Sequence, residues 1–206
     1  MISIVIPTQN SERQLVPTLA ALVQGVTGGI LRDVILADGG SSDDTAAIAD
    51  AAGCVFLPGI NDPGVRLRQG AAQGRGRWLL FLSPASILEE GWAREVSSFL
   101  EMVERCGMGD RATATFRLSV DGYGFGPRLG EAVAAARLAV LGRPRPGQGL
   151  LISKRHYERI GGHPAGLAAE RRLIARIGRR HIHVLRARVL LPVPGSVPAD
   201  PEQAGP

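Results

Sequence analysis

The stretch ISIVIPTQN, residues 2–10, decides the fold class, because an apolar run ends there in turn-forming and polar residues. Similar short apolar runs occur at residues 34–37, 54–57 and 78–82. Each has the length of a buried strand and is followed by residues that favour turns. We therefore predict a strand at each of these four places.

The segments between these runs have helical periodicity. In the first segment Leu15, Leu19 and Leu22 share one face. After the fourth run, Ser86 and Glu89 have the spacing of a capping box that opens another amphipathic helix. Alternating strands and helices predict a single α/β domain, Rossmann-like, with a mostly parallel twisted sheet covered by helices on both faces.

The second half of the chain continues this domain. We expect strands at residues 113–120 and 149–152, a helix at 128–141, and helical turns from Lys154 and from Leu167. The domain is expected to span residues 1–191, with a nucleotide-binding half at 1–110 and an acceptor-side half at 111–191. Residues 192–206 are rich in Pro, Ala and Gly, and we predict a disordered tail there.

Composition narrows the classes of function. The 206 residues carry a net charge of +5, which would suit nucleic acid, but aromatic residues make up only 4% and no nucleic-acid motif is visible. We therefore expect no nucleic-acid partner. The N-terminus lacks a signal peptide and no apolar run could span a bilayer, so we expect a cytoplasmic protein. Peripheral contact with the inner face of the membrane, or with a lipid-linked acceptor, also accounts for the positive charge.

Three turns are the places to look for a binding site. In parallel sheets ligands bind beyond the carboxyl ends of the strands. The residues that follow strands here are PTQN at 7–10, DGGS at 38–41 and SPAS at 83–86.

Two blocks, SIVIPTQN at residues 3–10 and VILADGGSSDDT at 34–45, resemble in order and spacing the opening blocks of family 2 glycosyltransferases. The resemblance continues through residues 66–70, 78–82, 116–118, 147–149 and 161–164, to about residue 191. The later blocks are similar to the small bacterial subgroup of arsenosugar-type glycosyltransferases. This resemblance implies a GT-A fold and the transfer of a sugar from a nucleotide-diphosphate sugar to an acceptor, with inversion at the anomeric carbon.

In this family the first block cradles the nucleoside and the acidic residue after the second strand binds the base. The resemblance therefore implies nucleotide-binding roles for Pro7, Thr8, Asn10 and Asp38. A carboxylate and a hydroxyl at strand ends can satisfy a base edge or ribose hydroxyls. The alternative is that Asp38 only begins a turn. Gly39 stands where the family often has a second aspartate.

The family pattern has an Asp-x-Asp metal motif where this chain has SPAS at residues 83–86. Hard divalent cations prefer carboxylate oxygens, so we expect no metal site and no cofactor. Arginine can neutralise a diphosphate instead, because guanidinium binds phosphate oxygens bidentately. Arg66 and Arg68 are the candidates, and a solvated helix face is the alternative interpretation.

Glu170 stands at the position of the family's catalytic base, within the block AERRL at residues 169–173. It shares a helical face with Leu173 and Ile177, where a carboxylate is costly unless it is paired or lines a cleft. The resemblance implies that Glu170 removes the acceptor's proton, and an ion pair with an arginine is the alternative. Gln148 is matched as a sugar or acceptor contact.

Two other functions fit parts of the pattern. A non-catalytic relative that keeps nucleotide binding would explain both the missing acidic pair and the altered block around Glu170. A nucleotidyltransferase shares this sheet type but needs a glycine-rich loop with a basic residue after the first strand, and residues 7–10 do not provide one.

Overall fold

The computed structural model describes residues 1–121, 144, 147–177 and 182–192. Within these residues, eight strands form one sheet in the order β3-β2-β1-β4-β7-β6-β8-β5. The strands are β1 (Ile2–Thr8), β2 (Leu31–Asp38), β3 (Val55–Leu57), β4 (Trp78–Phe81), β5 (Ile87–Leu88), β6 (Thr113–Asp121), β7 (Leu150–Ser153) and β8 (Ile182–Pro192). The helices are α1 (Glu12–Thr27), α2 (Thr45–Ala51), α3 (Pro63–Gln73), α4 (Trp92–Arg105), α6 (Lys154–Arg159) and α7 (Ala169–Ile177).

The N-terminal half of the sheet is parallel throughout. β1 pairs in parallel with β2 and β4, and β2 pairs in parallel with β3. β7 runs antiparallel to β4 and β6, whereas β6 and β8 are parallel to each other. The carboxyl ends of β1, β2, β3 and β4 therefore meet at one edge, as the alternating pattern predicts.

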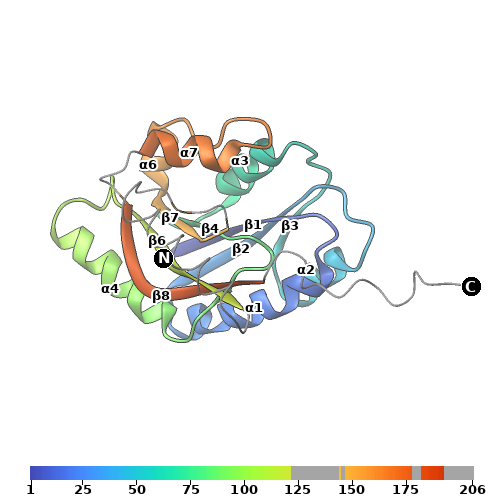
Figure 1. The fold of residues 1–206 in the computed structure, drawn as a ribbon, viewed down its shortest axis with the longest axis horizontal. Helices are drawn as coiled ribbons and strands as arrows, with labels where there is room; N and C mark the ends of the chain where they lie inside the picture. The colour runs from blue at the N-terminus through green and yellow to red at the C-terminus, as the bar shows by residue number, and fades with distance from the viewer. Residues whose placement is uncertain (122–143, 145–146, 178–181, 193–206) are drawn as a thin grey trace, which may run out of the picture.

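Helices cover both faces of the sheet (Figure 1). α1 and α4 lie on one face, where Leu15, Trp92 and Phe99 pack into the larger apolar cluster together with Phe116 and Val189 from the second half of the chain. α3, α6 and α7 lie on the other face, over a second cluster. This confirms the predicted α/β domain with a two-sided helical cover. Both halves of the chain contribute strands to the same sheet.

Most of the expected elements are present. All four strands of the first half, the strands near residues 113–120 and 149–152, and helices after Lys154 and Leu167 are confirmed. The helix expected at 128–141 lies outside the described residues. Two strands, β5 and β8, are not among the expectations.

The expected capping box at Ser86 is wrong. α4 begins at Trp92 and its N-cap is Gly91, while residues 87–88 form β5 beside β8. Ser86 instead donates its hydroxyl to the Gly147 carbonyl at 2.9 Å. A tertiary partner for the serine thus replaces the local helix contact that the spacing suggested.

The end of the chain differs slightly from expectation, since β8 includes Pro192 and residues 193–206 are not described. No helix within the described residues is both long and apolar enough to cross a membrane.

Candidate active site at the carboxyl ends of the strands

The ends of β1 and β2 are joined by side chains. Thr8 and Asp38 are both buried, and the Thr8 hydroxyl donates to Asp38 Oδ1 at 2.9 Å. They are also register partners in the ladder between β1 and β2. Pro7 lies beyond Val5 and Phe81, which are the last pair in the ladder between β1 and β4.

The Asp38 carboxylate accepts four hydrogen bonds within the protein. Oδ1 accepts from the Thr8 and Ser41 hydroxyls, and Oδ2 accepts from the backbone N–H groups of Gly40 and Ser41, at 2.8 and 2.7 Å. Burial by itself would raise the pKa of Asp38, but the hydrogen bonds outweigh it and hold the pKa below the ordinary value. Asp38 is therefore an ionised carboxylate that organises its own loop.

Asn10 connects the first two loops at the surface. Its backbone N–H donates to the Ser41 hydroxyl at 2.8 Å, and its Oδ1 accepts from Ser42 N–H at 2.9 Å. Its φ is +46°, in the left-handed region that asparagine tolerates better than most residues. The side chain is exposed at the carboxyl edge, where it can meet a ligand.

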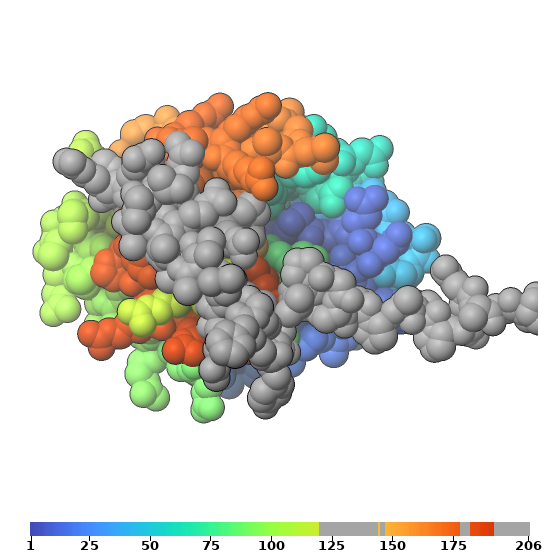
Figure 2. All heavy atoms as spheres, in the orientation of Figure 1, coloured from blue at the N-terminus to red at the C-terminus, as the bar shows by residue number. Residues whose placement is uncertain are grey.

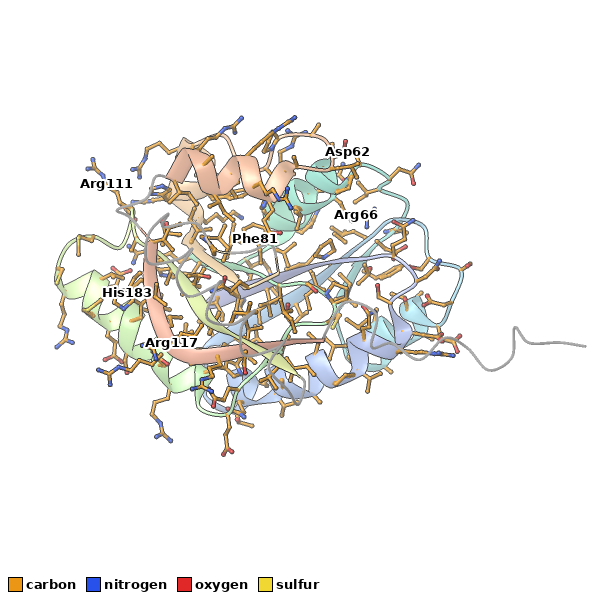
Figure 3. The ribbon with its side chains drawn as sticks, in the orientation of Figure 1. Asp62, Arg66, Phe81, Arg111, Arg117 and His183 are labelled. Atoms are coloured by element: carbon orange, nitrogen blue, oxygen red, sulfur yellow. The ribbon has the colours of Figure 1, made fainter. Side chains whose placement is uncertain are left out.

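Arg66 lies beneath these loops, between α3 and the end of β1 (Figure 3). Its side chain is buried and donates to the carbonyls of Thr8, Ile60 and Asn61, at 2.8, 2.9 and 3.2 Å, and to Gln9 Oε1 at 3.4 Å. Burial lowers the pKa of Arg66, and the charges of Asp38 and Asp62 oppose that shift. Arg66 thus ties together the segments that follow β1 and β3.

The Arg66 guanidinium also explains why residue 39 is a glycine. A Cβ atom at position 39 would lie 2.2 Å from Arg66 Nη2. An aspartate at this position would collide with the guanidinium, so the glycine and the arginine fit each other.

Arg68 is arranged differently from Arg66. It is exposed, and its positive charge helps to lower the pKa of Asp62, after the larger effect of hydrogen bonds from Gly166 and Val65. Asp62 is the N-cap of α3 and accepts Gly166 N–H at 2.8 Å. The two arginines predicted for diphosphate binding therefore lie at different depths, and the solvated-face interpretation describes Arg68 better than Arg66.

The turn after β4 is stabilised by its own serines. Ser83 N–H donates to the Ser86 hydroxyl at 3.0 Å, and Ala85 N–H donates to the Ser83 hydroxyl at 3.1 Å. The Thr18 hydroxyl of α1 donates to the Pro84 carbonyl at 2.7 Å. Both serine oxygens are thereby occupied, and the turn offers no carboxylate.

Hydrogen bonds through the backbone of Gly147 connect Glu170 to the turn after β4. The Gly147 N–H donates to Glu170 Oε1 at 3.2 Å, while its carbonyl accepts from Ser86. Gly147 has φ +80°, and a Cβ atom at this position would lie 3.3 Å from Ser83 Cβ. The sequence predictions for residues 83–86 and for Glu170 thus fall at one place in the structure.

Glu170 has the electrostatics of a weak acid near neutrality. Burial raises its pKa to about 7, and the hydrogen bond from Gly147 opposes the shift. Among the described residues no arginine forms an ion pair with Glu170. The ion-pair alternative therefore has no partner in this part of the chain, and a carboxyl poised near pH 7 is suited to proton transfer.

Gln148, next to Gly147, is buried and donates its amide to the Phe116 carbonyl at 2.7 Å. Phe116 lies in β6. This places Gln148 beside the Glu170 contact while anchoring its amide nitrogen inside the protein.

Two buried groups near α7 were missed by the sequence reasoning. The Tyr157 hydroxyl and His163 Nδ1 lie 2.9 Å apart, and His163 packs against the Phe81 ring. Burial lowers the pKa of His163 to about 3, so the imidazole is neutral. Nothing in the local pattern distinguishes this histidine. By contrast, the Asp62-Pro63 pair is a helix-start signal that could have located the N-cap of α3.

The described residues contain no group of three or more His, Cys, Asp or Glu side chains arranged to hold a metal ion.

Comparison with solved structures defines the class of the fold. The structure of S. aureus TarS 1–349 in complex with UDP-GlcNAc superimposes with a TM-score of 0.72 over 94% of this chain and 58% of that one, at 15% identity. Glucosyl-3-phosphoglycerate synthase from Mycobacterium tuberculosis, in complex with Mn²⁺, UDP and glucosyl-3-phosphoglycerate, gives 0.61 over 94% of this chain and 70% of that one, at 21% identity. The chain has the GT-A type of α/β fold, and it spans about three fifths of TarS 1–349.

Comparison with models of protein families gives a match in the N-terminal half of the chain. Residues 3–101 match the family model described as Glycosyl transferase family 2. No curated protein sequence matches the chain. The match covers just under half of the chain, including β1 to β4.

Proposed function

We propose that this protein transfers a sugar from a nucleotide-diphosphate sugar to an acceptor, with inversion and without a divalent metal ion. The observation that carries the proposal is the meeting of Glu170, Gly147 and the turn after β4 beside the carboxyl ends of the parallel strands. Support comes from the family match and from structural neighbours that hold UDP or UDP-GlcNAc.

In this proposal the nucleoside lies over the loops that follow β1 and β2. Asn10 is exposed there and is the side chain best placed to contact it directly. Thr8, Asp38 and Arg66 shape the loops from below through their hydrogen bonds. Arg68 is free to reach solvent and supplies positive charge toward a diphosphate.

Glu170 acts as the general base on the acceptor side. As the acceptor oxygen attacks the anomeric carbon, Glu170 takes the hydroxyl proton, and the nucleoside diphosphate leaves from the opposite face of the sugar. A carboxylate with a pKa of about 7 is a stronger base than an ordinary glutamate, and it is ionised in about half of the molecules near pH 7.

The turn at residues 83–86 is a poor match for a divalent metal ion. Its oxygen ligands would be two serine hydroxyls that already accept backbone N–H groups. Mg²⁺ and Mn²⁺ prefer carboxylates and phosphates. In this proposal arginine and backbone N–H groups, and not a metal ion, neutralise the charge of the diphosphate.

A non-catalytic nucleotide-binding protein is the second candidate. The observation that favours it is the turn after β4, which offers no carboxylate and whose two serine hydroxyls already accept backbone N–H groups. This candidate predicts stabilisation by nucleotides with no turnover.

The test combines binding and turnover over a panel of nucleotide sugars, with manganese and with chelator. We expect binding that changes less than tenfold on chelation, and release of nucleoside diphosphate that falls roughly a hundredfold or more in Glu170→Gln. The same variant should bind donor normally, because Glu170 lies on the acceptor side. Binding without turnover would support the second candidate, and loss of binding on chelation would contradict metal independence.

A further inference from the structure

The two helical layers carry opposite charge. α3, α6 and α7 contain eight Arg or Lys residues and two Glu residues. α1, α2 and α4 contain three Arg residues and five Asp or Glu residues. The three cationic helices lie together over one face of the sheet, along the upper side of Figure 1.

The outer side of α7 is cationic and uncompensated. Leu173, Ile174 and Ile177 are buried, whereas Arg171, Arg172 and Arg176 are exposed. Within the described residues, Arg172 and Arg176 donate only to backbone carbonyls, at 3.2 to 3.4 Å. In the described part of the chain, none of the three arginines forms an ion pair with a carboxylate.

An apolar side chain projects beside these cations. Leu167, two residues before α7, is 94% exposed, the highest value among the exposed large hydrophobic residues. The orange atoms that include α7 and its preceding loop form the upper outer surface of the molecule (Figure 2). A single exposed leucine is ordinary, but a leucine next to an uncompensated cluster of arginines has the two components of interfacial binding.

We propose that the α7 surface, defined as Leu167, Arg171, Arg172 and Arg176, docks on an anionic lipid bilayer. The arginines would meet lipid phosphates, and Leu167 would enter the boundary between headgroups and acyl chains. Nucleic acid fits this surface less well, because α3, α6 and α7 expose no Phe, Tyr or Trp for stacking. Docking here does not depend on sugar transfer.

The position of the α7 surface has a consequence for the site. Glu170 lies on the inner side of the same helix, and an α-helix with its side chains is about 10 Å across. Docking would therefore hold Glu170 close to the lipid headgroups, where an acceptor carried by the membrane could reach it. This consequence rests on the proposed function, whereas the docking itself does not.

Vesicle co-sedimentation of the full chain, without nucleotide, tests the docking. We use vesicles of phosphatidylcholine alone and of phosphatidylcholine mixed with phosphatidylglycerol. The wild type should bind only the anionic vesicles, and added salt should weaken binding. Arg171→Gln/Arg172→Gln should weaken it on the order of twentyfold, since each arginine near an anionic surface contributes about fivefold. Leu167→Ser should weaken it roughly tenfold or more.

Arg94→Gln/Arg105→Gln is the matched control, because it removes the same charge from exposed positions on α4. This control should bind anionic vesicles within about twofold of the wild type. The proposal is overturned if the wild type does not bind anionic vesicles, if the two double variants lose binding equally, or if Leu167→Ser binds as tightly as the wild type. Binding of an oligonucleotide in place of vesicles would assign the surface to nucleic acid. Nucleotide affinity, measured separately on the same proteins, distinguishes a failure of docking from a failure of the proposed function.

Discussion

Asp38 and Arg66 show that a residue whose chemistry suits ligand binding can instead organise the loops of a site. Asp38 has the chemistry of a base-binding carboxylate, yet its oxygens accept hydrogen bonds from Thr8, Gly40 and Ser41. Arg66 has the chemistry of a phosphate ligand, yet it donates mainly to backbone carbonyls. Both residues shape the site by fixing the backbone around it.

Replacing Arg66 with alanine should destabilise the protein strongly. The change leaves the carbonyls of Thr8, Ile60 and Asn61 without their donor, and each unsatisfied buried group costs about 1–3 kcal/mol. We expect the free energy of unfolding in urea to fall by about 3 kcal/mol or more. Arg68→Ala, on the exposed side of the same helix, should change it by less than about 0.5 kcal/mol. Equal effects of the two variants would contradict this account of Arg66.

Glu170 should make stability depend on pH in an unusual direction. Its pKa is raised from 4.5 to about 7 in the folded state, so between these values the folded protein binds a proton that the unfolded chain has released. The free energy of unfolding should therefore fall as pH rises through this interval. Glu170→Gln cannot titrate and should lose less stability between about pH 5 and pH 8. Urea unfolding of both proteins measures the difference, and parallel pH profiles would argue against a raised pKa.

At the scale of elements, the start of α3 packs directly against the loop before α7. A Cβ atom at Gly64 would lie 1.8 Å from the Pro164 carbonyl oxygen. Asp62, at the start of the same helix, accepts Gly166 N–H. The beginning of α3 thus holds the loop that leads into Glu170.

Gly64→Ala distinguishes local propensity from packing. Helix propensity alone predicts that alanine stabilises a helix by about 1 kcal/mol relative to glycine. The close approach of Pro164 predicts the opposite sign, a loss of roughly 2 kcal/mol, because α3 and the loop must separate. Thermal or urea unfolding gives the sign. Gln69→Ala, exposed on the same helix, serves as the control for propensity, and a stabilised Gly64→Ala protein would refute the packing account.

At the scale of the whole molecule, the two halves of the chain depend on each other. β4 pairs with β7, and the apolar face of α4 packs in one cluster with Leu185 and Val189 of β8. The family match at residues 3–101 therefore covers a segment that lacks part of its own core.

A fragment of residues 1–110 should consequently fail to fold. Without β7 and β8 it exposes an unpaired edge of β4 and the buried residues of α4, so circular dichroism on heating should show no cooperative transition. Adding a fragment of residues 111–206 should restore helical signal if the halves complement each other. A cooperative transition in the first fragment alone would show that it is an independent domain.

The local sequence pattern was sufficient to predict an element wherever the element's own residues determine its secondary structure and its buried side. The apolar runs at 2–7, 34–37, 54–57 and 78–82 determined the parallel half of the sheet, and the periodicity after Leu167 determined α7. The site could be located from the same pattern, because the turns after parallel strands must share one edge. The resemblance to family 2 glycosyltransferases adds the role proposed for Glu170.

Tertiary structure alone decided the features that depend on distant partners. β5 has two residues and forms only because β8 runs beside it, and Ser86 leaves its expected capping box for the Gly147 carbonyl. The depth of Arg66 and the exposure of Arg68 likewise depend on which side of α3 faces the sheet. The sequence by itself determined which groups reach the carboxyl edge of the sheet. The tertiary structure decided whether each group is hydrogen-bonded within the protein or left for a ligand, because burial and hydrogen-bond partners come from residues far apart in the chain.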